Sequence, residues 1–228
     1  MTTAEWDLAE TGHRLLRKGH DLRVRVIELP AEPDGGHVLI FGEPTDGCLV
    51  RIHSRCLYGD ALQTDDCDCG PALEKAMDFI QAAGSGILIY LEQEGRGAGL
   101  VNKARGLRTS QEDQVDTFRS YAKLGLPRDA RRYEQAVAAL QRLGLSSIRL
   151  MTNNPDKVQA VQKAGIKVTV RSLHTRPRSR RARAYLETKR LVGQHTLPKN
   201  DGRLADLAAV RLWLRSGWFS MRRWWHGR

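Results

Sequence analysis

The sequence predicts an α/β protein, because strand-like apolar runs alternate along it with segments whose apolar residues recur at helical spacing. GILIYLEQ at 86–93 has the continuous apolar character of a strand that is buried on both faces. SIRLMTNN at 147–154 predicts a second strand, and a helical pattern lies on either side of it. This order is expected when neighbouring strands are joined through helices.

Upstream of these runs, HVLIFG at 37–42 and CLVRIH at 48–53 predict two short strands. The turn-rich sequence EPTDG separates them, so we expect a hairpin. From Pro71 onward apolar residues recur at helical spacing, and Gly84 or Gly86 ends this helix. A helix therefore separates the expected hairpin from the buried strand that follows.

Downstream, the glycine-rich turn EGRGAG follows the strand at 86–93, and NKARGL opens a helix. Apolar spacing predicts a helix over 133–140, and Pro155 begins the helix PDKVQAVQKAG. IKVTVRSL is the last expected strand. The run RPRSRRARA at 176–184 is too charged to pack, and we expect it to be a loop or a solvated basic face.

Length and composition indicate a globular protein with one large domain, or with one domain and appendages: 228 residues, of which 41% are apolar. No apolar run is long enough to span a bilayer, and the N-terminus lacks the pattern of a secretory signal, so we expect a cytoplasmic protein. The net charge of +11 is concentrated in residues 171–228, which hold 15 Lys and Arg against three Asp and Glu. Residues 1–170 are therefore close to neutral, and we expect no binding of nucleic acid.

Three cysteines lie close together in the sequence, at Cys56, Cys67 and Cys69. Residues as close as Cys67 and Cys69 can hardly bridge each other, and three thiolates suit a zinc ion whose fourth position stays open for catalysis. Two alternatives are a structural zinc site completed by His53 and small apolar cysteines that bind no metal. Cys48 lies in a strand-like run and is expected to be an ordinary buried cysteine.

Two further motifs are suited to phosphates. Glycines in QEGRGAGL allow close approach of the backbone, and Arg96 offers a planar fork of donors beside Glu94. TNNPDK places Lys157 in the first turn of a helix, where backbone N–H groups attract anions. An ordinary strand-to-helix turn and a plain Asn-Pro turn are the alternatives.

Asp129 and Arg131, expected at the start of a helix, form a fourth motif for which a helix cap and a solvated arginine are the alternatives. Taken together and in this order, the four motifs resemble GTP cyclohydrolase II, the first enzyme of riboflavin synthesis. The resemblance covers roughly residues 37–195. It includes RIHSRCLYGD, CDCG, QEGRGAGL, the pair Asp116-Thr117, MTNNPDKV, YLETK and His195.

The resemblance implies a three-layer fold in which helices flank a mixed β-sheet. It also implies a catalytic domain at 1–195, an extension at 196–228 and a homodimer. Four tryptophans among arginines in that extension are compatible with an anionic membrane surface, but we favour a helix that packs on its own dimer with a frayed basic end.

The implied reaction converts GTP to a diaminopyrimidinone ribosylamine phosphate, formate and pyrophosphate, with magnesium on the phosphates. The three clustered cysteines would ligate one zinc ion per subunit, and Asp129 matches the proton acceptor. Arg131 matches the proposed nucleophile, although a guanidinium stays protonated, so that a charge clamp on the α-phosphate is the alternative role. The residues implied to contact the nucleotide are Arg51, Ile52, His53, Ser54, Arg55, Glu94, Gly95, Arg96, Thr117, Thr152 and Lys157.

Four positions depart from the family pattern. Leu107 stands where the family has a tyrosine, and Arg55, Ala72 and Arg119 replace acidic or amide residues. These changes bear on base recognition and on the second hydrolysis. Besides the full reaction, we therefore consider a variant that stops at the ring-opened formamide or uses another purine nucleotide. A catalytically silent nucleotide-binding regulator is the third hypothesis, against which the retained cysteines, Asp129 and Arg131 count.

Overall fold

The computed structural model of the protein describes residues 8–31 and 35–198. The compact unit described below ends at Leu197. None of the helices in these ranges is both long and apolar enough to cross a membrane. The Trp-rich part of the predicted extension lies outside the described residues, so the boundary after 195 and the proposed contacts of that extension stay predictions.

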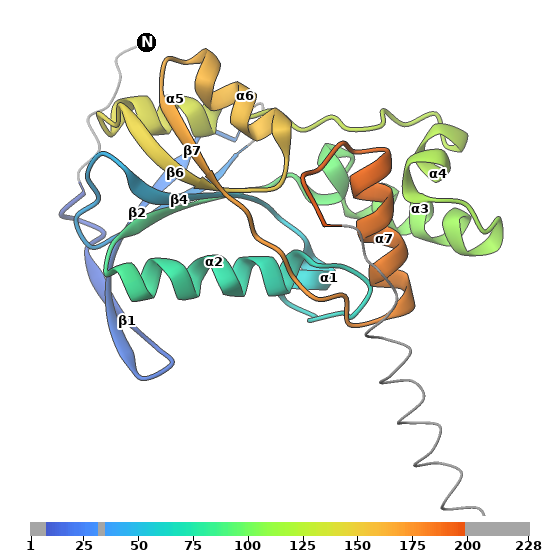
Figure 1. Cartoon of the computed structure of the whole chain (residues 1–228), viewed down its shortest axis with the longest axis horizontal. Coiled ribbons are helices and arrows are strands. Elements are labelled where there is room, and N and C mark those ends of the chain that lie inside the picture. The colour runs from blue at the N-terminus through green and yellow to red at the C-terminus, as the bar shows by residue number, and fades with distance from the viewer. Residues whose placement is uncertain (1–7, 32–34, 199–228) are drawn as a thin grey trace, which may run out of the picture. The chain divides into compact units, whose positions relative to one another are not determined.

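One mixed sheet of seven strands, in the order β1-β2-β3-β5-β4-β6-β7, organises this unit (Figure 1). The pairs from β1 to β5 are antiparallel, whereas β5, β4, β6 and β7 run parallel to one another. The strands are β1 (His13–Arg17), β2 (His20–Leu29), β3 (Gly36–Phe41), β4 (Cys48–Ser54), β5 (Gly86–Leu91), β6 (Ser147–Met151) and β7 (Lys167–Arg171). The expected strands exist, but β1 and β2 were not predicted.

The expected hairpin of β3 and β4 is wrong. Strand β5 lies between them, antiparallel to β3 and parallel to β4. The turn-rich loop instead binds the start of β6: Asp46 accepts hydrogen bonds from the backbone N–H and hydroxyl of Ser146 at 2.7 and 2.6 Å, and the Gly47 N–H donates to Ser147. A local turn signal thus marks a reversal that is held by a distant strand.

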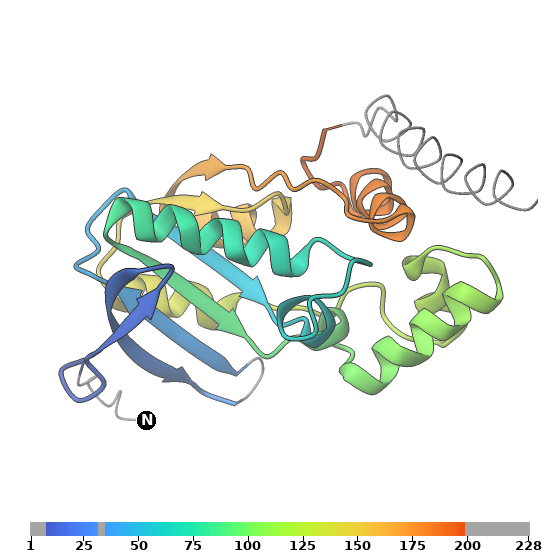
Figure 2. The ribbon, with the colours of Figure 1, turned by 90° about the horizontal axis from the view of Figure 1, so that it is seen from below.

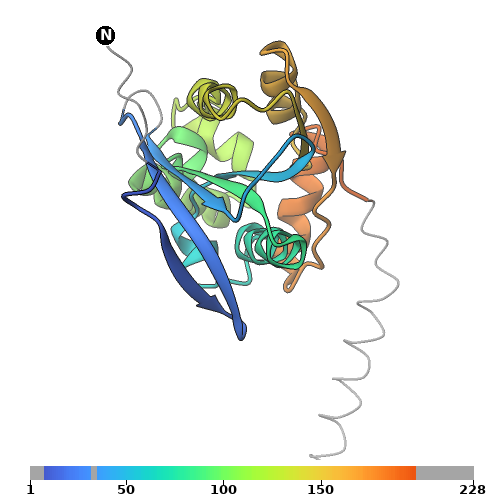
Figure 3. The same ribbon diagram turned by 90° about the vertical axis from the view of Figure 1, so that its left-hand side faces the viewer.

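The helices lie in three groups, of which two cover the sheet. They are α1 (Leu57–Asp60), α2 (Cys69–Ala83), α3 (Leu100–Glu112), α4 (Thr117–Lys123), α5 (Glu134–Arg142), α6 (Pro155–Lys163) and α7 (Arg180–Leu191). Figures 1 and 3 show α5 and α6 on one face and α2, with the short α1 beside its start, on the other, whereas α3, α4 and α7 lie beyond one end of the sheet. The predicted three-layer α/β fold is therefore confirmed.

Each face of the sheet has its own apolar core, which explains why these helices form. Ala136, Leu140 and Val161 from α5 and α6 pack on Ile52 and Ile89 in one core. On the opposite face (Figure 2), α2 buries Ala76 and Ile80 against β-strand residues such as Leu49 and Leu88. The helix ends at Gly84, which adopts a left-handed φ of 73° as its C-cap, as predicted.

The basic run at 176–184 does not remain a loop. Helix α7 begins at Arg180 behind the N-cap Ser179, whose hydroxyl accepts from the Ala182 N–H at 3.0 Å, and the helix buries Ala182 and Leu186. Arg176, Arg178, Arg180 and Arg181 are exposed, so the run forms the solvated basic face that was one of the two expectations, although the helix itself was not predicted. Asp129 was expected at the start of a helix. It lies instead in an irregular segment before α5, whose N-cap is Tyr133.

Truncation of Ile89 to Ala tests the core on the α5–α6 face. Ile89 is fully buried in the central strand β5, so we expect a loss of about 2–5 kcal/mol in the free energy of unfolding. Leu16, which is 76% exposed on β1, is the matched control, and its truncation should change stability by less than about 0.5 kcal/mol. Denaturant titration measures both, and an equal effect of the two substitutions would contradict the assigned core.

Candidate active site

The site lies where three adjacent parallel strands end. The carboxyl ends of β5, β4 and β6 lead into Glu94, Cys56 and Thr152, and ligands of open α/β sheets bind at such ends. A cavity of about 510 Å³ opens there, also walled by α3, α4 and α7. Segments that are far apart in the sequence therefore meet in one pocket.

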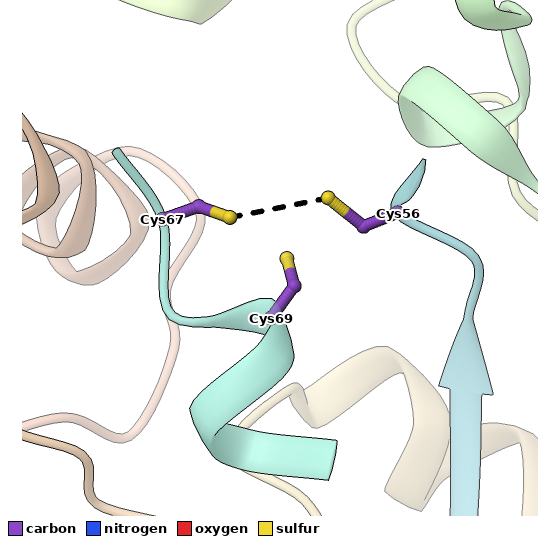
Figure 4. A group of neighbouring side chains, drawn as sticks. All are labelled: Cys56, Cys67 and Cys69. Carbon is purple, nitrogen blue, oxygen red and sulfur yellow. Dashed lines mark hydrogen bonds between the residues drawn. The ribbon is translucent and has the colours of Figure 1, made fainter. Parts of the chain in front are cut away.

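Three cysteine sulfurs converge at one wall of this pocket (Figure 4). The Sγ atoms of Cys56, Cys67 and Cys69 all lie within 4.8 Å of one another, and those of Cys56 and Cys67 are 3.9 Å apart. Tetrahedral zinc with Zn–S bonds of about 2.3 Å separates its sulfurs by about 3.8 Å. The donor set therefore fits one zinc ion with a further position open. Cys48 is buried in β4, apart from this cluster.

Two glycines permit the cluster to form. A Cβ on Gly59 would lie 2.9 Å from the Cys67 sulfur and 2.8 Å from the Cys69 Cβ. A Cβ on Gly70 would lie 2.2 Å from the Gly59 carbonyl oxygen. The first turns of α1 and α2 can approach this closely only because neither residue has a side chain.

Lys103 and Glu94 hold the first cysteine in place. Lys103 Nζ lies 3.2 Å from the Cys56 sulfur and 2.7 Å from a Glu94 carboxylate oxygen. The other oxygen of Glu94 accepts from the Leu57 N–H at 2.6 Å, directly after the cysteine. The thiols of Cys67 and Cys69, with Lys103, lower the pKa of Cys56 to about 3. The glycine-rich turn is thus coupled to the metal-ligand cluster. Lys103 was quoted only within a motif, and no role was predicted for it.

Both ring nitrogens of His53 contact other side chains, which argues against a structural zinc site completed by this residue. Its Nε2 lies 2.9 Å from Asp60 Oδ2, and its Nδ1 lies 3.3 Å from the Arg51 guanidinium. Asp60 also accepts from the Cys56 N–H at 3.0 Å and from the Tyr90 hydroxyl at 2.9 Å. Burial lowers the pKa of His53, so the imidazole is neutral at ordinary pH. This network supports the floor of the pocket.

The glycine-rich turn presents Arg96 to the pocket in a constrained backbone conformation. Gly95 and Arg96 have φ of 61° and 59°, which is unusual for a non-glycine residue. Arg96 stacks on the Phe118 ring at 3.7 Å and donates from Nη2 to the Thr117 hydroxyl at 3.1 Å. Its buried Nη1 has no hydrogen-bond partner among the described residues. A guanidinium group that is held in place and keeps one N–H donor unpaired is suited to an anionic ligand.

Asp129 and Arg131 form a bidentate ion pair. Arg131 Nε and Nη2 donate to the two carboxylate oxygens at 2.9 and 2.5 Å. Burial disfavours the guanidinium, but the hydrogen bonds to Asp129 outweigh it and raise the pKa of Arg131 above its usual value. The segment is anchored by the Ala130 N–H, which donates to the Arg96 carbonyl at 3.0 Å, and by Gln93, which donates to the Arg132 carbonyl.

Lys157 and Arg51 are buried cations without an acidic partner among the described residues. Lys157 Nζ donates to the Ile52 carbonyl at 2.9 Å, and Arg51 donates to the Met151 carbonyl at 2.9 Å. Burial lowers the pKa of Lys157 well below its ordinary value, and the charges of Arg51 and Arg131 add to this effect. Such a group of like charges is costly to bury unless an anion joins it.

Helix α7 and the residues behind it complete the wall. Tyr185, Lys189 and His195 line the pocket, and Lys189 forms an ion pair with Asp68 at 2.5 Å. Burial and the charges of Lys189, Arg131 and Lys157 lower the pKa of His195 to about 4. No role was predicted for these three side chains. Their only signal in the sequence was that YLETK and His195 continue the family resemblance.

The other implied site residues are brought together, with one exception. Ser54, Arg55, Glu94, Gly95, Thr117 and Thr152 all line the pocket, whereas the Ile52 side chain packs in the core and only its carbonyl faces Lys157. Leu107 and Ala72 also line the wall, and Arg119 is exposed and paired with Asp116 at 3.5 Å.

Replacement of Cys67 by Ser tests the metal-ligand cluster. One of three sulfurs is lost, so we expect the zinc content of purified protein to fall from about one per chain to well below half, whereas Cys48→Ser should leave it unchanged. Elemental analysis after dialysis measures both. Retention of stoichiometric zinc by the Cys67 variant would remove this cysteine from the ligand set.

Comparison with known proteins agrees with this geometry. The family model described as GTP cyclohydrolase II matches residues 19–172. GTP cyclohydrolase-2 of Neisseria meningitidis serogroup A is 48% identical over 164 residues, which cover 69% of this chain and 82% of the relative. GTP cyclohydrolase-2 of Acinetobacter baumannii (strain SDF) is 44% identical over 158 residues, 69% of this chain and 78% of the relative.

Among solved structures, a two-domain 3,4-dihydroxy-2-butanone 4-phosphate synthase from A. baumannii matches 62% of this chain and 32% of its own, with 14% identity and a TM-score of 0.27. The family match, by contrast, spans more than half of the chain and includes all three clustered cysteines, the ion pair of Asp129 and Arg131, and Lys157. The chain belongs to the GTP cyclohydrolase II family.

Proposed function

We propose that this enzyme opens the imidazole ring of GTP by hydrolysis and releases formate and pyrophosphate. The product is 2,5-diamino-6-(5-phosphoribosylamino)pyrimidin-4-one, and the reaction serves riboflavin biosynthesis. The observation that carries the proposal is a single pocket in which three thiols lie beside cations that lack acidic partners among the described residues. Membership in the family supports the choice of GTP.

The cations favour a polyphosphate ligand. Arg96 has a donor to spare, and Lys157 and Arg51 are buried beside neutral carbonyls. Lys157 lies in the first turn of α6, and the positive end of a helix dipole favours anions. A triphosphate would neutralise all three side chains at once, which offsets the free-energy cost of their burial.

The thiol cluster is suited to hold the metal of this reaction. Cys56, Cys67 and Cys69 would bind one zinc ion per subunit, and a bound zinc ion supplies Lewis acidity for hydrolysis. The ammonium group of Lys103 beside the Cys56 sulfur offsets part of the negative charge of three thiolates. Magnesium would accompany the phosphates, as is usual for nucleoside triphosphates.

Arg131 acts as a charge clamp in our proposal and not as a nucleophile. Its two-point ion pair with Asp129 stabilises the guanidinium, and a protonated guanidinium has no lone pair with which to attack phosphorus. Asp129 then holds the clamp in orientation. The charge of Arg131 would stabilise the α-phosphate as pyrophosphate leaves.

A variant reaction that stops at the ring-opened formamide remains the second candidate. The observation that favours it is the aliphatic side chain of Leu107 in the pocket wall, where the family has a phenol. Arg55, paired with Glu92 at 2.6 Å, and the buried Ala72 also change the wall. Loss of one proton donor would slow the second hydrolysis, which releases formate, more than the first.

Product stoichiometry tests the proposed reaction. Pure protein incubated with GTP, zinc and magnesium should release formate and pyrophosphate in a ratio of about one to one. Enzymatic assays of the two products, with mass spectrometry of the pyrimidine, measure this. Pyrophosphate without formate would favour the formamide variant, and absence of both products would reject the proposed function.

Replacement of Lys157 by Met tests the role of the buried cation. A charge-assisted contact contributes about 1.5–3 kcal/mol, so we expect the apparent affinity for GTP to fall roughly 10- to 150-fold. Without GTP the melting temperature should stay equal or rise, because an apolar side chain replaces a basic group whose charged form is disfavoured by burial.

Lys163→Met on the exposed side of the same helix is the control and should change neither quantity. Calorimetric titration with GTP and thermal melting separate the two effects. Unchanged affinity of the Lys157 variant would exclude this lysine from the phosphate site.

A further inference from the structure

We propose that α7 is part of the active site and that Lys189 is a positioning residue. Through its ion pair with Asp68, Lys189 holds the loop of Cys67 and Cys69 in place relative to the turn between β6 and α6. The proposal deepens the proposed function, on which the identities of metal and nucleotide rest. Figures 1 and 2 show α7 beyond the end of the sheet, on the same side of the molecule as α3 and α4.

The first contact joins α7 to the metal-ligand loop at its centre. Lys189 Nζ lies 2.5 Å from Asp68 Oδ1, and the two side chains are only 16% and 10% exposed. Asp68 stands between Cys67 and Cys69 and is the N-cap residue of α2, which begins with Cys69. A group that fixes Asp68 therefore fixes the backbone between two sulfurs. Burial disfavours the ammonium form, but Asp68 outweighs it and raises the pKa of Lys189 above its ordinary value.

Further contacts join the start of α7 to the same loop. The Ser179 hydroxyl donates to the Asp65 carbonyl at 2.7 Å, and Arg181 lies 3.5 Å from the Asp66 carboxylate. The arginine pair is exposed, and contributes little by itself. The buried Lys189–Asp68 pair is therefore the contact with the greatest effect.

The end of α7 binds the opposite side of the pocket. The chain turns back at Gly193, the His195 N–H donates to the Lys189 carbonyl at 3.1 Å, and the Thr196 N–H donates to the Asn153 carbonyl at 2.9 Å. Asn153 follows Thr152 in the turn between β6 and α6, and Lys157 lies in the first turn of α6. One helix thus bridges the metal-ligand loop and the phosphate-binding turn.

A positioning role and a purely electrostatic role of Lys189 predict opposite effects of its removal on zinc binding, so one measurement can distinguish them. Removal of a positive charge near a cation site strengthens cation binding if only Coulomb forces matter. Removal of a residue that orders the ligand loop weakens it, and loss of a group behind the ligands commonly costs about 10- to 100-fold in metal affinity. The sign of the change in zinc affinity therefore separates the two.

The experiment compares Lys189→Met with Lys189→Arg and Arg190→Met in the full chain. Arg190 pairs with Glu187 on the same helix, so its substitution removes the same charge without touching the loop. The zinc dissociation constant is measured by chelator competition without nucleotide, and the cobalt(II)-substituted protein reports ligand geometry by its visible spectrum. We expect zinc binding weakened at least tenfold in Lys189→Met, with an altered cobalt spectrum, and values within threefold of wild type in the other two variants.

Asp68→Asn and the double variant Asp68→Asn/Lys189→Met keep the test meaningful if Lys189→Met folds poorly, because the double variant leaves no unpaired buried charge. If the ion pair positions the loop, zinc binding by the double variant is no weaker than by Asp68→Asn alone. Additive losses, or zinc binding by Lys189→Met within threefold of wild type or tighter, would overturn the proposal. So would an effect confined to GTP affinity. Because zinc binding is measured without GTP, a failure of the proposed reaction leaves this result interpretable.

Discussion

The active site depends on one constraint, which is that β5, β4 and β6 are parallel neighbours and end at the same edge of the sheet. Each end releases one functional segment: Glu94 and Arg96 after β5, Cys56 after β4, and Thr152 with Lys157 after β6. Because the two faces of the sheet are covered by α2 and by α5 with α6, the spacing of these ends is set by a rigid core. The side chains that line the pocket can therefore occupy irregular backbone without losing their mutual placement.

Charge is the second organising feature, and it is distributed unevenly between paired and solitary groups. Lys103, Arg131 and Lys189 each have a carboxylate within hydrogen-bonding distance, whereas Lys157 and Arg51 rest on backbone carbonyls. The paired cations hold their segments in place whether or not a ligand is bound. The solitary cations raise the free energy of the unliganded pocket, and an anion lowers it again. The unliganded protein is thus less stable because of these groups, and binding of an anionic ligand restores the lost free energy.

Local pattern was sufficient for much of the fold, and for a physical reason. Burial of the strand at 86–93 and the amphipathic helix that α2 forms are recorded in the spacing of apolar residues, and the cysteine cluster is recorded in its spacing and chemistry. Pairing partners are not recorded in this way, so the hairpin of β3 and β4 was wrong: EPTDG specifies a reversal and not which strand comes next to it. Strands β1 and β2 were not predicted, because charged residues interrupt them. Lys103 and Gln93 could not have been assigned their roles, since these depend on contacts with segments distant in sequence.

The helix α7 shows most clearly how a nonlocal partner changes the meaning of a sequence. Taken alone, RPRSRRARA has too much like charge to pack, and the inference of a solvated segment follows from that. The acidic loop that contains Asp65, Asp66 and Asp68 faces the start of α7, and the helix buries Ala182 and Leu186 while Arg180 and Arg181 stay exposed. These acidic residues lie on either side of Cys67, so the contacts that join α7 to the acidic loop, above all the buried pair of Lys189 and Asp68, also hold the metal-ligand loop. The family match ends at residue 172, but Leu173, Tyr185, Lys189 and His195 also line the pocket, so the site extends beyond the matched residues.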